Sequence, residues 1–99
     1  MTKPLFVFAE ITPKPQHLED ARDAIVGIID QTRTEPGCKS FEVFDGLEAG
    51  SLYLFEEWHD QSALDAHYGQ PYTAAVFASY EKWLQKPPTI HKLSRLGTG

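Results

Sequence analysis

A strand-forming run near the N-terminus constrains the fold of this chain most. Residues 5–12, LFVFAEIT, are rich in β-branched and aromatic residues and end at Pro13, which predicts a strand. Successive side chains of a strand point to opposite faces, so Phe6 and Phe8 share one face and the alternate apolar residues share the other. A sheet with helices on one side only normally has a polar outer face. Both faces of this strand are apolar, so we expect both faces to be buried against other protein surfaces.

A second run repeats this pattern. Residues 51–58, SLYLFEEW, place Trp58 and the leucines on one face, and Tyr53 and Phe55 on the other. A chain of 99 residues predicts a single domain, 1–99, with no spare element to cover a second apolar face. Large exposed apolar patches usually mark interfaces. We therefore expect a two-fold homodimer in which this face meets the same face of a second copy.

Helical spacing fills two intervals between the strands. Apolar residues recur at three and four from Gln16, which predicts one helix that continues to Glu35, ahead of a Pro-Gly pair. Asp60 is placed to cap a short helix, which a Gly-x-Pro sequence at 69–71 ends. A further helix begins at Pro71 and ends before the next Pro-Pro pair. Its expected buried stripe comprises Thr73, Val76, Phe77, Tyr80, Trp83 and Leu84.

The predicted strands complete one sheet. They lie at 5–12, 38–45, 51–58 and 89–96, the last as an edge strand, with 97–99 as a loose tail. The runs 38–45 and 51–58 are separated by a short loop with glycine, which is typical of a hairpin. The order βαββααβ predicts an α+β, ferredoxin-like antiparallel sheet with helices on one face. With a second copy it would form a dimeric α+β barrel.

Composition and missing motifs exclude several classes of protein. The net charge is −5 and the nine Lys and Arg residues are scattered, so we expect no nucleic-acid partner. A single cysteine, the lack of a signal-peptide pattern and the lack of a long apolar run predict a cytoplasmic protein without membrane segments. No glycine-rich nucleotide loop is present, so we expect no cofactor. A metal shared by His59, His67 and Asp60 is a weak alternative, and we expect none.

One histidine and a pair of acids carry the candidate chemistry. His67 follows Leu64 by three residues, so it shares the apolar side of the short helix, either as a structural residue or as a proton carrier. By strand parity Glu56 lies on the face of Trp58 and Glu57 on the opposite face, so one of the two points towards an apolar face. Such a carboxyl would have a raised pKa and could act as a base. The same question arises for Glu10.

Two stretches resemble the antibiotic biosynthesis monooxygenase family, a group of small dimeric α+β barrels that includes quinol monooxygenases. The first stretch is RTEPGC at 33–38. The second is EEWHDQSALDAH at 56–67, followed by Pro71. Together with the order of elements, the resemblance covers nearly the whole chain. It is more specific for the fold and the dimer than for the reaction.

The resemblance implies a cofactor-independent oxygenase of an electron-rich aromatic such as a quinol or an anthrone. In that chemistry the pocket removes a proton, and the substrate anion itself activates oxygen. By position, Trp58 would line the pocket and His67 would stand at its polar end. Two residues depart from the family pattern. Tyr72 stands where many relatives have histidine, and Leu54 stands where some oxygenases have a polar amide.

We therefore expect a monooxygenase that acts on a small apolar or aromatic, quinol-like metabolite in a pocket between the sheet and the helices. The candidate catalytic residues are His67, Trp58 and Tyr72, and the candidate substrate-binding residues are Glu56, Leu54, Phe77 and Tyr80. One alternative is a cofactor-free isomerase or tautomerase that uses His67 and an acid. Others are a non-catalytic small-molecule-binding stress-response module and, more distantly, a heme enzyme.

Overall fold

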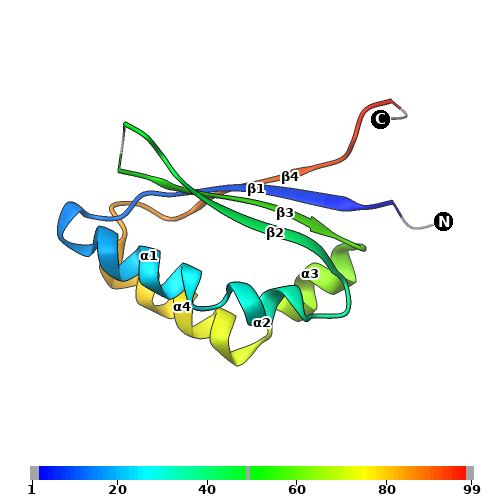
Figure 1. The fold of residues 1–99 in the computed structure, drawn as a ribbon, viewed down its shortest axis with the longest axis horizontal. Coiled ribbons are helices and arrows are strands. Elements are labelled where there is room, and N and C mark those ends of the chain that lie inside the picture. Colours follow the sequence, from blue (N-terminus) through cyan, green and yellow to red (C-terminus); the bar gives the residue numbers. More distant parts are fainter. Residues whose placement is uncertain (1–2, 49, 98–99) are drawn as a thin grey trace.

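The protein, seen here in a computed structural model, is an α+β fold built on one sheet. The structure describes residues 3–48 and 50–97, so most of the expected tail at 97–99 lies outside it. The strands pair antiparallel in the order β2-β3-β1-β4. All helices lie against one face of this sheet (Figure 1). The ferredoxin-like fold class is confirmed. The strands are β1 (Leu5–Ile11), β2 (Cys38–Asp45), β3 (Leu52–Trp58) and β4 (Thr89–Leu93).

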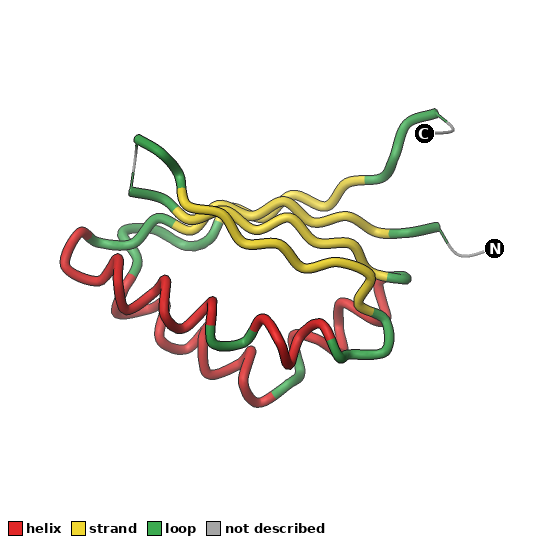
Figure 2. The backbone as a smooth tube through the Cα atoms, viewed as in Figure 1, coloured by secondary structure: helices red, strands yellow, loops and turns green. Residues whose placement is uncertain are grey.

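The predicted single helix from Gln16 to Glu35 is wrong, because the structure divides it. A 3₁₀ turn, Pro15–His17, leads into α1 (Leu18–Val26), and α2 (Ile29–Arg33) follows after a break (Figure 2). The break falls at Gly27 and Ile28, and glycine is the least favourable ordinary residue in a helix interior apart from proline. Neither these helices nor the other described ones are long and apolar enough to cross a bilayer.

The two C-terminal helices begin where the sequence predicts. Helix α3 (Gln61–Tyr68) follows Asp60, whose side chain accepts a hydrogen bond from the Ala63 amide at 2.9 Å. Helix α4 (Pro71–Trp83) starts at a proline, which lacks the amide hydrogen that would go unpaired there. The expected buried stripe of α4 is only partly correct. Its other members are buried, but Phe77 is 37% exposed and Trp83 is half-buried.

Strand pairing places the core on the helix side of the sheet. In the central pair, Val7 lies opposite Glu56 and Ala9 opposite Leu54, and all four side chains face the helices and are buried. The outer face carries Phe8 next to aromatic and imidazole rings, as expected for the alternate residues. Strand β4 lies at the edge of the sheet and ends at Leu93, three residues earlier than predicted.

Candidate active site

A tight turn between α2 and β2 carries a buried acid towards α3. Glu35 lies in this turn, where its amide bonds to Thr32 and its carbonyl accepts from Cys38. Gly37 follows, and a Cβ atom there would lie 2.2 Å from the Cβ of Ala63. Only glycine permits so close an approach. The start of α3 therefore packs directly on the turn, and the Glu35 carboxylate reaches the interior beside the same helix.

That carboxylate binds the candidate histidine. His67 Nδ1 lies 2.9 Å from Glu35 Oε2, and both side chains are buried. The Tyr72 hydroxyl donates to the same oxygen. Because an ionised carboxylate only accepts, Nδ1 of a neutral His67 carries the proton, and Nε2 is left with its lone pair. Buried charges are stable only when paired and hydrogen-bonded, so the three groups hold one another in a fixed arrangement.

A second acid lies on β3, next to the indole of the motif. Trp58 Nε1 donates to Glu56 Oε1 at 2.9 Å, and both side chains are buried. The Trp58 ring also packs against the His67 ring, with centroids 4.7 Å apart. The indole thus touches both candidate proton-transfer groups, orienting one through its N–H group and the other through its ring.

Burial changes the proton affinity of these groups. Removal from water raises the pKa of Glu56 to about 7, and the charge of Glu35 adds to this rise although the Trp58 hydrogen bond opposes it. Near neutral pH, Glu56 therefore exists in both protonation states. Partial burial, and next the hydrogen bond to Glu35, raise the pKa of Tyr72 to about 12. Tyr72 consequently stays protonated and keeps donating to Glu35.

The two proton-transfer groups line one largely enclosed cavity between sheet and helices. Its volume is about 30 Å³. Besides His67 and Glu56, its wall includes Leu54, Phe77 and Tyr80, and the remainder is mostly aliphatic. Burial also raises the pKa of Tyr80 above its usual range, with the Glu56 charge as the second cause. A low-polarity cavity with a paired imidazole and a carboxyl of shifted pKa is suited to proton abstraction.

The structure brings most of the sequence-predicted site residues together, though in different roles. All four expected substrate-binding residues, and His67, line the cavity. Trp58 and Tyr72 do not. Trp58 lies behind the wall, where it is fully buried against His67 and Glu56, and Tyr72 lies behind Glu35. Both contact other residues of the site: Trp58 contacts Glu56 and His67, and Tyr72 contacts Glu35.

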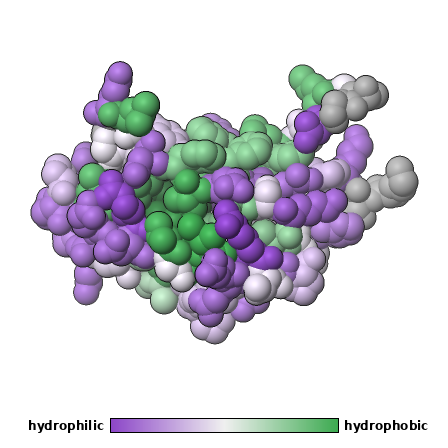
Figure 3. All heavy atoms as spheres, viewed as in Figure 1, coloured by the Kyte–Doolittle hydropathy of each residue, from purple (hydrophilic) through white to green (hydrophobic). Residues whose placement is uncertain are grey.

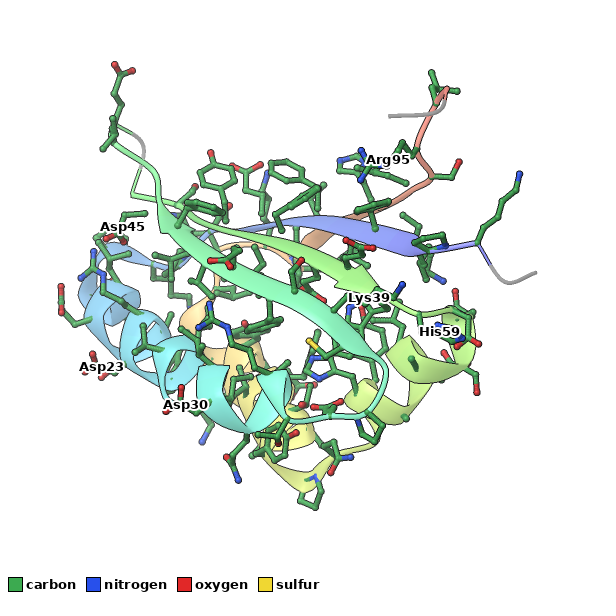
Figure 4. All side chains as sticks on the ribbon, turned by 45° about the vertical axis from the view of Figure 1, so that its right-hand side comes forward. Asp23, Asp30, Lys39, Asp45, His59 and Arg95 are labelled. Atoms are coloured by element: carbon green, nitrogen blue, oxygen red, sulfur yellow. The ribbon has the colours of Figure 1, made fainter. Side chains whose placement is uncertain are left out.

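Other polar residues considered from the sequence lie elsewhere. Glu57 pairs with Phe6 and Glu10 with Tyr53 on the outer face, where the Tyr53 hydroxyl donates to Glu10 at 3.3 Å. His59 is exposed at the start of α3 and points away from the interior (Figure 4). His59 is thus separated from the buried His67, with which it was considered as a metal ligand. Within residues 3–48 and 50–97, no three His, Cys, Asp or Glu side chains gather as a metal site.

Sequence reasoning missed Glu35 as a site residue. Its position at the end of a predicted helix suggested only a boundary. The available signal was its place inside the first family-like stretch, residues 33–38. A carboxylate that pairs with a histidine 32 positions later is a tertiary contact, which local spacing does not reveal.

Comparisons with known proteins identify the family of this chain. Residues 4–79 match the sequence pattern of a family described as "Antibiotic biosynthesis monooxygenase". The chain is 34% identical over 100 residues to the Mycobacterium tuberculosis protein named "Putative monooxygenase Rv0793", covering 97% of this chain and 95% of that one. The solved structure of Rv0793 superimposes with a TM-score of 0.90 over 96% of this chain and 97% of the other, at 30% identity.

A second solved structure gives the same result. PA3566 from Pseudomonas aeruginosa has a TM-score of 0.90 and 28% identity, over 98% of each chain. The match of the family pattern extends from the start of β1 almost to the end of α4, so it includes Glu35, Glu56 and His67. By its sequence, its fold and the span of this match, the chain belongs to the antibiotic biosynthesis monooxygenase family.

Proposed function

We propose that the protein is a cofactor-independent monooxygenase of a small hydroxylated aromatic, such as an anthrone or a quinol. The observation that carries this proposal is a buried His67, paired with Glu35, on the wall of an apolar cavity that Glu56 also lines. Family membership and the name of the relative from M. tuberculosis support monooxygenase chemistry. The aliphatic and aromatic wall supports an apolar ring as the substrate.

The proposed reaction assigns a separate step to each group. His67 Nε2 removes a proton from the substrate, and Glu35 stabilises the imidazolium that forms. The substrate anion then gives electrons to O₂, and one C–O bond forms. For an anthrone, a CH₂ group and O₂ become a carbonyl group and water, so the substrate supplies all four electrons. The peroxide takes a proton back from the imidazolium, and His67 then removes the second C–H proton, so that the C=O bond forms as the O–O bond breaks. Glu56, protonated for part of the time near neutral pH, donates the proton with which hydroxide leaves as water.

Oxygen uptake tests this proposal directly. An electrode records uptake with a panel of anthrones and hydroquinones for the unaltered protein, for His67→Ala and for His59→Ala. Loss of a general base slows a reaction by about 10²- to 10⁴-fold, so His67→Ala should be nearly inactive, whereas the exposed His59 variant should match the unaltered protein. Equal uptake by all three proteins would remove His67 from the mechanism. Absence of uptake across the panel would contradict the oxygenase assignment.

One observation favours a second candidate, an isomerase or tautomerase. His67 and Glu56 line the same cavity. A 1,3-proton shift requires one group that removes a proton and a second group that returns a proton at another atom. This function needs no oxygen. It predicts deuterium incorporation at a substrate carbon in anaerobic D₂O, which the monooxygenase reaction does not require.

We also propose that the protein acts as a homodimer joined through the outer face of the sheet. Phe8, Phe55 and Phe44 leave apolar surface exposed there. The β2–β3 hairpin tip and the segment after β4 both rise on the same side, away from the helices (Figure 1). Each presents a leucine to solvent: Leu47 is 98% exposed and Leu96 is 94% exposed. A second copy on this face would cover both leucines and the aromatic rings.

A further inference from the structure

The cavity that holds His67 and Glu56 is too small for the substrate class proposed above. Its volume is about 30 Å³. One water molecule occupies roughly 30 Å³ in the liquid, and an apolar cavity that admits benzene measures roughly 150 Å³. A ring can therefore reach the catalytic groups only if part of the wall moves. The position of that part decides the route of entry and the size limit on the substrate.

Most of the wall has no freedom to move outward. Val7, Ile25, Phe41 and the other apolar wall residues from β1, α1 and β2 are buried in the core cluster. Core packing is dense, and moving such residues would disturb the whole cluster. Two wall residues differ: Phe77 on α4 is 37% exposed and Ile90 on β4 is 40% exposed. The movable part of the wall thus lies where α4 faces the edge strand.

Phe77 stands at the centre of this part of the wall. Its ring meets the Tyr68 ring edge-on at 5.6 Å between centroids and the Tyr80 ring at 5.3 Å. Such edge-to-face pairs contribute only about 0.5–1.5 kcal/mol each beyond the area they bury. Rotation of a partly exposed ring out of these contacts is therefore a small energetic change, and rotamer changes of exposed side chains are fast.

An open groove lies directly outside the ring cluster. It measures about 970 Å³ and shares three residues with the cavity wall: Tyr68, Phe77 and Ile90. The small side chains of Ala74 and Ala78 also line it, together with the charged side chains of Glu81 and Lys92. On the face drawn in Figure 3, hydrophobic side chains gather near the middle between hydrophilic ones, and the groove between α4 and β4 adds further apolar lining.

We propose that this groove between α4 and β4 is the outer half of the substrate site, and that Phe77 is the residue that sets substrate size. The inference rests on the proposed function for the identity of the ligand. A hydroxylated ring enters as Phe77 turns aside and reaches His67 and Glu56. The rest of a fused-ring aromatic then lies in the groove against Ala74 and Ala78. The ligand class is a planar aromatic of two or more fused rings rather than a single ring.

Fluorescence of Trp58 tests the route without any substrate. Trp58 is fully buried behind the cavity, and Trp83 is the second tryptophan, so Trp83→Phe gives a protein with one reporter. In that background, Phe77→Ala should raise the acrylamide quenching constant of Trp58, because truncation brings solvent into the cavity whose wall residues His67 and Glu56 contact the indole. Val26→Ala removes an exposed apolar side chain from α1 and should leave quenching unchanged. Equal quenching in the Trp83→Phe protein and in both variants made from it would contradict entry past Phe77.

Binding of two probes tests the groove itself. Calorimetric titration with phenol and with 2-naphthol compares the unaltered protein with Ala78→Phe, which fills the groove from an exposed position. We expect 2-naphthol to lose about tenfold or more in affinity, about 1.4 kcal/mol, and phenol to lose less than about threefold. Equal losses of affinity for both probes, or no loss for either, would contradict the groove as part of the substrate site. Neither experiment measures oxygen uptake, so failure of the monooxygenase proposal would be seen separately.

Discussion

The two faces of the sheet differ in which side chains they bury and which they leave exposed. On the helix side, Glu35, Glu56 and His67 are buried, and each has a hydrogen-bond partner. On the outer side, aromatic rings such as Phe8 and Phe55 remain partly exposed. A buried acid normally costs stability and an exposed apolar ring normally invites association. The difference agrees with the two proposals, which assign chemistry to the inner face and contact with a second copy to the outer one.

Two phenylalanines on the same strand provide the strongest test of this contrast. Phe41 on β2 is fully buried in the core, and Phe44 on the same strand is half exposed on the outer side. Phe41→Ala should lower the free energy of unfolding by about 3–5 kcal/mol, because it loses apolar burial and leaves a cavity. Phe44→Ala should change it by less than about 1 kcal/mol in dilute protein. Urea denaturation measures both values, and similar losses would show that the outer face is also core.

A charge on the outer face tests the proposed dimer. Phe8 lies in the middle strand pair, opposite Phe55 and His91. Phe8→Glu should weaken association by about 3 kcal/mol, or roughly 100-fold in Kd, because the carboxylate would be buried without a partner. Val26→Glu places the same charge at an exposed apolar position on the helix side and should leave association unchanged. Sedimentation equilibrium measures both, and a monomeric unaltered protein would contradict the dimer.

Local rules predicted the scaffold of the inner face well. Strand parity placed Glu56 with Trp58 and Glu57 on the opposite side, as the structure shows, because alternation in a strand is fixed by backbone geometry. The cap at Asp60 followed from the side-chain oxygen that a free helix end requires. These features depend on neighbouring residues, so spacing alone determines them.

Features that depend on tertiary packing could not be predicted in the same way. The pairing of Glu35 with His67 requires that a turn and a distant helix meet at Gly37, which spacing does not reveal. The exposure of Phe77 depends on how far the edge strand covers α4. The site was thus predicted as a set of residues but not as an arrangement.

The pH dependence of stability tests the buried acid of the inner face. Burial raises the pKa of Glu56 from 4.5 to about 7, so between these values the folded protein binds more protons than the unfolded chain. The free energy of unfolding should therefore fall as pH rises from about 4.5 through about 7, by roughly 2–3 kcal/mol from this residue. Glu56→Gln should remove that part of the decline. Glu57→Gln, the neighbour on the outer face, should retain it. Urea denaturation midpoints of the unaltered protein and both variants at pH 5 and pH 8 measure the decline in stability.

The smallest expected effect compares two tyrosine hydroxyls that each donate to a carboxylate. Tyr72 donates to buried Glu35, and Tyr53 donates at 3.3 Å to Glu10 on the outer face. Tyr72→Phe leaves a buried carboxylate short of a donor and should cost about 1–2 kcal/mol, whereas water can replace the hydroxyl lost in Tyr53→Phe, which should cost under about 0.5 kcal/mol. Thermal and urea unfolding of both variants measure the difference. If the two costs were equal, the Glu35 carboxylate would have access to water, and the fixed arrangement of Glu35, His67 and Tyr72 would have to be abandoned as the basis of catalysis.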